Sequence, residues 1–393
     1  MTLTSLRKLA LVLLFFAAIF EPSDRVFGLK MHLFSLFVLL GLVALVVDDE
    51  ISMPRFPHLL YVFTLALVFP AWGLTVSLVF NPGSLGSDAF QYFKSHLFLI
   101  FSLFLAPPSL LRFAERTFIA LLVILAHVII ILFLVALFAP PQLYGAVVLF
   151  GRQTDLFLLG ERVYAGVRFP GMYYVTAPLL VFALAYYMER SSRKLDKGTL
   201  YLILVSAAGL FLSGTRNTIL MSLLIPAYYF LRHRSGRVVL ALALPVVIYV
   251  GASVLQAMFD PKDVSTSVKI GYLADYSTIL SEPKNLLLGH GLGTRFFSSA
   301  RGEVVSITEL SYFEIVRTYG VFVGIAFFLY LIYPLLLLIR SRNSMYYCLI
   351  GYAAYLTENY SNPYMLSSNG MLVLGLVAAL AFQPKDRHLP ASI

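Results

Sequence analysis

Apolar runs of membrane-spanning length recur along this chain and are broken by charged or Pro/Gly-rich stretches. A helix needs about 20 apolar residues to cross the hydrocarbon core of a bilayer. The runs predict an all-α polytopic membrane protein with about twelve transmembrane helices. The approximate segments are Leu6–Phe20, Leu29–Val47, His58–Phe80, Ala89–Ala106, Phe118–Ala139, Met172–Met188, Leu200–Leu212, Thr218–Leu231, Val238–Met258, Val321–Ile339, Met345–Leu356 and Met371–Phe382. Several are short for a crossing, and we expect their ends to extend into the polar flanks.

Two long stretches interrupt this pattern, residues 140–171 and residues 259–320. No internal repeat, low-complexity run or linker separates the chain into parts. We therefore expect residues 1–393 to form a single transmembrane domain that carries two long loops. The second loop contains a segment that reads as a re-entrant or amphipathic helix.

Composition excludes a soluble globular protein. Of the 393 residues, 60% are hydrophobic and 12% are charged, whereas soluble domains average about 25% charged residues. The net charge of +9 does not indicate nucleic-acid binding, because the basic residues fall in loops and at membrane edges. The single cysteine, Cys348, offers neither a disulfide nor a cysteine metal site. The first twenty residues resemble a signal peptide but lack an Ala-x-Ala cleavage site, so we expect a retained helix.

Basic residues orient the predicted helices. Placing the N-terminus inside puts 16 of the 29 Lys and Arg residues in short cytoplasmic connections or tails, where the positive-inside rule applies. Most of the basic residues on the outer side belong to the two long loops, which cross largely regardless of charge. We expect both termini in the cytoplasm and both long loops outside.

Several cations lie where a charge near the hydrocarbon needs compensation. Arg216 lies in the turn Ser213–Thr218 between two short apolar runs. It could reach lipid phosphates, or it could clamp an anion with its planar donor fork. Lys94 lies in the fourth segment and could extend outward or face an anionic ligand. Arg168, with two other arginines of the first loop, could contribute to a cationic vestibule.

The second loop contains the glycine motif Gly289-His290-Gly291-Leu292-Gly293. Closely spaced glycines let the backbone approach a ligand and direct N–H groups at an anion. The spacing does not match a dinucleotide fingerprint, and no βαβ unit surrounds it. His290 is either a structural hydrogen-bonding residue or a catalyst.

The stretch Thr308–Gly320 reads as a helix with Thr308 as its N-cap and a glycine at its end. Glu314 and Arg317 are spaced to form a local ion pair. Glu309 is either a first-turn carboxylate favoured by the helix dipole or a general base in a cavity. The sequence shows no local partner for it. No His, Asp or Glu cluster has metal-ligand spacing, so we predict no metal.

The order of these features resembles the O-antigen ligase and polymerase superfamily of lipid-linked glycan transferases. The features are an Arg-Asn turn after a short segment, a long outer loop with the glycine motif, and a helix that enters the next apolar segment. The resemblance covers roughly Arg168 to Ile339. It implies a multi-helix C-type glycosyltransferase of the bacterial inner membrane, acting on undecaprenyl-pyrophosphate-linked glycans without a metal or cofactor.

The resemblance also implies roles for residues. Arg216 and either Arg295 or Arg301 would bind the pyrophosphate, and Glu309 stands where ligases of this superfamily carry a histidine. That difference favours a polymerase that joins two lipid-linked repeat units; a ligase that transfers glycan to lipid A core is the alternative. The catalytic candidates are Glu309 and Arg216, and the substrate-binding candidates are Arg168, Arg295, Arg301, His290, Lys94, Tyr312 and Arg317. The expected partners are a lipid-linked donor and acceptor and membrane lipids, with a chain-length regulator and a flippase as further candidates.

A transporter or lipid flippase is the alternative from a different class, because it also has about twelve helices and buried charges. Transporters tend to place charges near the bilayer midplane and to contain repeated halves. Here the charges outside the short cytoplasmic connections collect in long loops on one predicted side. This distribution favours an enzyme with a one-sided site.

Overall fold

The computed structural model describes residues 2–47, 54–86, 88–164, 167–232, 244–245, 247–256, 264–341 and 345–383, and most of them are helical. In this part of the chain, five helices are long and apolar enough to cross a membrane. They are α1 (Leu3–Phe20), α2 (Lys30–Val47), the continuous helix Phe56–Phe80, α6 (Pro108–Phe138) and α14 (Ser311–Arg340). The continuous helix consists of α3 (Phe56–Phe63), a π-helical turn (Thr64–Val68) and α4 (Phe69–Phe80). The chain is a helical membrane protein.

Shorter helices occupy most of the other predicted apolar segments. They are α5 (Asp88–Leu97) with the 3-10 helix Phe98–Leu105, α8 (Leu180–Arg193), α9 (Lys197–Leu212), α10 (Arg216–Arg232), Val247–Gln256, α15 (Tyr346–Glu358) and α16 (Ser368–Ala381). Of the predicted segment 238–258, residues 238–243, 246, 257 and 258 lie outside the described residues. The count of twelve crossings stays a prediction, because several of these helices are too short to span by length alone.

Both long loops contain regular structure. The first holds α7 (Pro141–Thr154) and an antiparallel hairpin of β1 (Phe157–Tyr164) and β2 (Val167–Tyr174). The second holds α12 (Val264–Leu280), α13 (Pro283–Leu288) and a small hairpin of β3 (Phe296–Ser298) and β4 (Glu303–Val305). The expectation that helix begins at Met172 is wrong, since Met172 lies in β2 and α8 begins at Leu180. A short apolar run does not by itself distinguish a strand from a helix.

Helix α16 lies in the core of the bundle. Its side chains from Asn369 to Leu380 are buried, and it packs against the Phe98–Leu105 helix and α14. A helix that is hydrophobic on all sides has to be surrounded by other elements. The close approach requires Gly375, whose added Cβ would lie 2.6 Å from the ring of Phe101.

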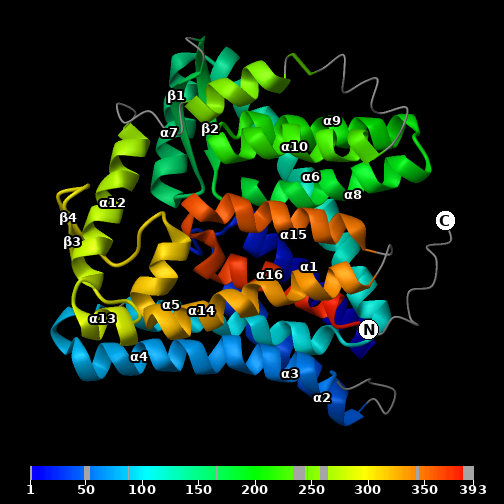
Figure 1. Ribbon diagram of the computed structural model, residues 1–393. Helices are drawn as coiled ribbons and strands as arrows, with labels where there is room; N and C mark the ends of the chain where they lie inside the picture. The colour runs from blue at the N-terminus through cyan, green and yellow to red at the C-terminus, as the bar shows by residue number, and fades with distance from the viewer. Residues whose placement is uncertain are drawn as a thin grey trace.

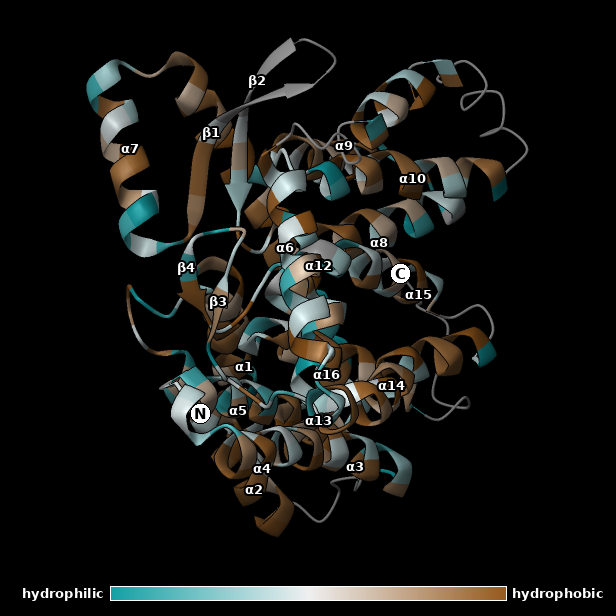
Figure 2. Cartoon of the chain, turned by 60° about the vertical axis from the view of Figure 1, so that its left-hand side comes forward, coloured by the Kyte–Doolittle hydropathy of each residue, from teal (hydrophilic) through white to brown (hydrophobic). Residues whose placement is uncertain are grey.

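The elements of both long loops gather on one side of the molecule (Figure 1). There α7, both hairpins, α12 and α13 lie together, while the first residues of α1 lie on the other side. In Figure 2, α12 of the second long loop is coloured mostly white to teal, whereas α2 is mostly brown. Helix α12 is therefore more hydrophilic than α2. The segments that the sequence separates by about a hundred residues are thereby brought to one end of the bundle.

Candidate functional site

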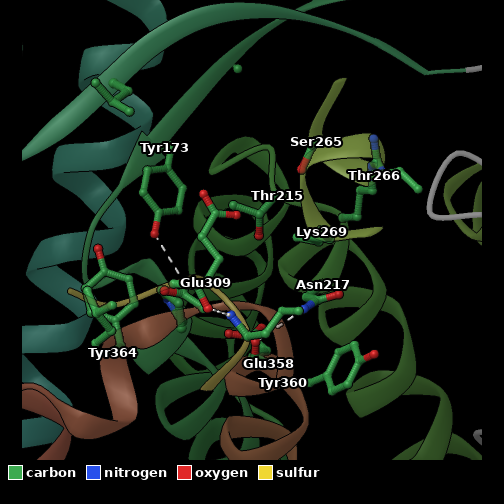
Figure 3. A pocket seen from close by; sticks show the side chains of 18 of the residues that line it. Tyr173, Thr215, Asn217, Ser265, Thr266, Lys269, Glu309, Glu358, Tyr360 and Tyr364 are labelled. Atoms are coloured by element: carbon green, nitrogen blue, oxygen red, sulfur yellow. Dashed lines mark hydrogen bonds between the residues drawn. The ribbon is translucent and has the colours of Figure 1, made fainter. Parts of the chain in front are cut away.

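A cavity of about 940 Å³ lies at this end of the bundle. Its walls come from the β1–β2 hairpin, the first turn of α10, helix α12, residues 301–310 and the stretch 358–364, which starts at the last residue of α15. Figure 3 shows side chains from these elements pointing toward one another. This volume falls at the upper end of the range for small-molecule pockets, and the mixed polar and aromatic lining suits a large polar ligand.

Local hydrogen bonds place Arg216 at the cavity. Helix α9 ends at Leu212. Two residues later, Gly214 has a φ of +70° and packs closely against Gly171 of the hairpin. Thr215 Oγ1 then accepts a hydrogen bond from the N–H of Thr218 at 3.2 Å and caps α10. Arg216 is therefore in the first turn, and its Nη1 donates to Thr266 Oγ1 of α12 at 2.9 Å.

Cations from three elements line the cavity. Arg216 comes from α10, Lys269 from α12 and Arg301 from the turn between β3 and β4. The first turn of α10 also points its N-terminal end toward the same space, where backbone N–H groups favour an anion. Arginine forks bind phosphate oxygens in a two-pronged contact. The arrangement is suited to a phosphate-bearing ligand.

Glu309 lines the cavity but has an ion-pair partner, so the expectation that it has none is wrong. Arg301 Nη2 lies 3.3 Å from Glu309 Oε1, and Arg301 Nη1 lies 3.6 Å from Glu303. The β3–β4 turn brings Arg301 close to Glu309, eight positions later in the chain. This contact could not be predicted from the three- and four-residue spacing of a helix. Helix α14 begins at Ser311, so Glu309 precedes the helix and Thr308 is not its N-cap.

The glycine motif packs against α4 and α14 through its backbone. Gly289, Gly291 and Gly293 all have positive φ angles, as a close backbone approach requires. However, the N–H groups of His290 and Gly291 donate to the carbonyl oxygens of residues 317 and 318, at 2.6 and 3.2 Å. The N–H of Leu292 donates to Gly73 at 2.9 Å. These donors are already used within the chain.

Arg317 and Glu314 form the predicted ion pair, and it is buried. Arg317 Nη1 also donates to Thr294 Oγ1 at 2.9 Å and to His290 Nδ1 at 3.1 Å. Tyr276 of α12 donates to Glu314 Oε2 at 2.8 Å. This network ties α12, the glycine motif and α14 together. Its members Arg317 and His290 do not line the cavity.

The position of His290 keeps it neutral. Burial, with smaller contributions from the charges of Arg317 and Lys284, lowers the pKa of His290 to about 4. Because Arg317 donates to its Nδ1, a proton on that nitrogen would break the contact. The structural role of His290 is the one that the geometry supports.

Other predicted substrate-binding residues also lie away from the cavity walls. Arg295 pairs with Asp88 at 3.5 Å, and Lys94 is exposed on α5. Tyr312 donates to a backbone carbonyl of α15 at 2.5 Å and packs on the cavity residue Tyr360. Arg168 lies in β2, and its side chain is outside the described residues.

Sequence reasoning missed the last residue of α15 and the stretch that follows it. Glu358, Tyr360, Asn362 and Tyr364 all line the cavity. Glu358 is 1% exposed, and within the described part neither carboxylate oxygen has a hydrogen-bond partner. It lies two positions beyond the predicted crossing Met345–Leu356, and burial raises the pKa of Glu358 well above its usual range. The sequence does single out Glu358 in one way, because it is the only charged residue from 343 to 384.

In the described ranges, no group of three or more His, Cys, Asp or Glu side chains could hold a metal ion. The charged groups of the cavity are instead arginine and lysine cations with two carboxylates. The chemistry that such a set can perform is charge neutralisation and proton transfer. No protein-family model, curated protein or solved structure matches this chain.

Proposed function

We propose that this protein is a glycosyltransferase of the bacterial inner membrane that polymerises surface polysaccharide such as O-antigen. Its substrates would be oligosaccharide repeat units linked to undecaprenyl pyrophosphate, joined on the periplasmic face. The observation that supports the proposal is the cavity in which Arg216, Lys269 and Arg301 meet Glu309 and Glu358. In the proposed reaction, the cations would bind the pyrophosphate of the donor, and a carboxylate would accept the proton of the acceptor sugar.

The proposed reaction needs little beyond these residues. The hydroxyl oxygen of the acceptor sugar forms a bond to the anomeric carbon of the donor, and the bond from that carbon to the pyrophosphate oxygen breaks. The electron pair leaves with the pyrophosphate, whose charge Arg216, Lys269 and Arg301 would neutralise. A carboxylate of the cavity accepts the proton of the hydroxyl. Sugar, lipid pyrophosphate and proton are then all accounted for.

The resemblance to the O-antigen ligase and polymerase superfamily points in the same direction. Of the two arginines that it left open in the second loop, Arg301 lines the cavity and Arg295 does not. A carboxylate, Glu309, stands where the ligases carry a histidine, which supports a polymerase. A flippase that supplies repeat units and a regulator of chain length would act beside such an enzyme.

Purified protein in lipid nanodiscs tests the proposal. We expect it to convert lipid-linked repeat units alone into long glycan, seen as a ladder on a gel, with EDTA present. Dependence on a divalent ion would contradict the metal-free chemistry. Product that forms only after a lipid A core acceptor is added would identify a ligase. The absence of both products, with repeat units moved across a proteoliposome membrane instead, would support the flippase.

A further inference from the structure

We propose that Glu358 is the base that accepts the proton of the acceptor hydroxyl, and that the stretch Glu358–Tyr364 holds the acceptor sugar. This inference rests on the proposed function. It places the acceptor sugar on the side of the cavity formed by Glu358–Tyr364 and the donor pyrophosphate on the side formed by Arg216 and Arg301. Glu358 is a buried carboxylate at the end of α15. Four alternate residues of this stretch face the same space.

An unpaired buried carboxylate is costly. Buried polar groups are almost always hydrogen-bonded, and a buried donor or acceptor without a partner destabilises the fold, more so when it is charged. Glu358 is 1% exposed, and neither carboxylate oxygen has a partner in the described part of the chain. Because Glu358 lines a large cavity, a ligand that enters the cavity can supply the missing donor. A sugar hydroxyl is such a donor.

Neighbouring side chains suit a sugar. Tyr360 is 44% exposed and lines the cavity together with Tyr364, so an aromatic face is available beside the carboxylate. Asn362 Nδ2 donates to the hydroxyl of Tyr173 across the cavity at 3.3 Å, while its Oδ1 is buried with no partner in the described part. The aromatic rings can stack on the apolar C–H face of a pyranose, and the amide and carboxylate groups can hydrogen-bond its hydroxyls. Figure 3 shows Tyr360 and Tyr364 in the lower part of the view, and Ser265 and Thr266 of α12 in its upper part.

The contacts of Glu309 give it a different role. Its carboxylate is 38% exposed and pairs with Arg301, whose Nη2 lies 3.3 Å from Oε1. A carboxylate that is paired with a phosphate-binding arginine is suited to orient that arginine. We therefore assign Glu309 as a positioning residue on the donor side. Asn217 connects the two sides, because its Nδ2 donates to the backbone carbonyl of Glu358 at 3.2 Å, next to Arg216.

The proposed step is a proton transfer coupled to the displacement. As the acceptor oxygen bonds to the anomeric carbon, its proton moves to a carboxylate oxygen of Glu358, and the pyrophosphate leaves with the electron pair. The proton then passes from Glu358 to water when the product leaves. Only the ionised carboxylate can act, so the rate should fall as the pH drops through the pKa of Glu358. Because burial raises that pKa, the fall should begin at a higher pH than an exposed glutamate would give.

Single-turnover rates at saturating donor, measured across pH in nanodiscs, test the assignment. We expect Glu358→Gln to slow the reaction about 10²- to 10⁴-fold and to abolish the acid limb of the profile, with donor affinity unchanged. Glu309→Gln should weaken donor binding and keep the acid limb. Glu115→Gln is the matched control, since Glu115 hydrogen-bonds Tyr347 at the other end of α15 and does not line the cavity.

The outcomes separate the two proposals. If the parent protein makes no glycan from lipid-linked repeat units, the proposed function is wrong. If the parent is active and folded Glu358→Gln turns over at a parental rate, only this inference is overturned. Should Glu358→Gln not fold, Tyr360→Ala decides: we expect a raised KM for the acceptor and an unchanged Kd for the donor. A raised donor Kd with an unchanged acceptor KM would place the acceptor elsewhere.

Discussion

Arg216 illustrates how one residue acquires a role from its surroundings. Its position in the first turn of α10 combines a full positive charge with the partial charge of the helix N-terminus. Its Nη1 is oriented by Thr266 of a second helix. A guanidinium that is held in place loses less side-chain freedom when it binds phosphate. The sequence could identify the charge, whereas its orientation depends on α12.

We predict that Arg216→Lys weakens donor binding more than it slows chemistry. An ammonium cannot reproduce the two-pronged contact to phosphate oxygens, and a hydrogen bond to a charged group contributes about 1.5–3 kcal/mol. The donor Kd should rise about tenfold or more, as measured by equilibrium binding of a lipid pyrophosphate. Arg25→Lys is the control, because Arg25 is an exposed arginine paired with Asp155. Equal effects of both substitutions would remove Arg216 from the donor site.

His290 gives a prediction about pH and stability. Its pKa is about 4 in the folded protein and about 6.5 in an unfolded chain. Between these values the unfolded chain binds more protons, so the free energy of unfolding rises with pH through this window. The contribution is therefore present above about pH 6.5 and is lost as the pH falls toward 4. His290→Gln should flatten this part of the stability profile, which unfolding measurements at pH 4.5 and 7 would detect. An unchanged slope would show that His290 does not titrate there.

At the scale of elements, the kink of α14 explains the glycine motif. Gly320 has a φ of +76° and interrupts the helix. The interruption frees the carbonyl groups of residues 317 and 318 from the N–H groups one turn later. The N–H groups of His290 and Gly291 take their place, so the buried carbonyl groups are satisfied, as burial requires. The motif and the kink therefore depend on each other.

We predict that Gly320→Ala destabilises the protein while Gly324→Ala does not. A Cβ at Gly320 would lie 2.3 Å from the carbonyl oxygen of Leu287, and a positive φ costs a non-glycine residue roughly 1–3 kcal/mol. Gly324 lies in the same helix with ordinary contacts of 3.5 Å or more, so alanine there should be neutral or stabilising by about 0.4–1 kcal/mol. Thermal unfolding in detergent compares the two. Similar midpoints for both variants would contradict the kink as a required feature.

The elements also show how far the sequence can be interpreted. Hydropathy locates helices such as α1, α2 and α6 because each one must be apolar along its own length. The start of α8 and the strand at Met172 were not predictable in this way, since the run is apolar in either conformation. Likewise, the helix expected from Thr308 begins at Ser311, because Thr308 accepts from the N–H of Leu310 and contacts Tyr276 instead of capping a helix.

At the scale of the molecule, the cavity could be predicted only in part. Arg216, Arg301 and Glu309 were identified as charges in unusual places, and the fold brings these three together. Lys269 and Glu358 were not identified, because the cavity is assembled from five segments whose packing cannot be predicted from a local sequence pattern. Arg295 and Arg317 show the opposite case. Both stood out as loop arginines, but Asp88 and Glu314 already engage them.

The arrangement of the whole chain leads to a prediction about topology. The elements of both long loops lie on one side of the molecule (Figure 1), and the short connections predicted to be cytoplasmic carry most of the basic residues. We therefore expect the long loops to be periplasmic and the connection between α8 and α9 to be cytoplasmic. Ser299 and Ser192 are exposed residues of these two regions and accept a cysteine probe.

Each probe is introduced as Ser299→Cys or Ser192→Cys in a background with Cys348→Ala, which removes a thiol that is only 1% exposed. An impermeant maleimide should label Ser299→Cys in intact spheroplasts, and it should label Ser192→Cys only after the membrane is opened. Both variants should be labelled once the membrane is opened, and this sample shows that each protein is expressed and that each cysteine is reactive. Labelling of Ser192→Cys alone in intact spheroplasts would invert the topology and place the cavity on the cytoplasmic face. A polymerase that acts on periplasmic repeat units would then be impossible, whereas labelling of Ser299→Cys alone leaves the cavity open to them.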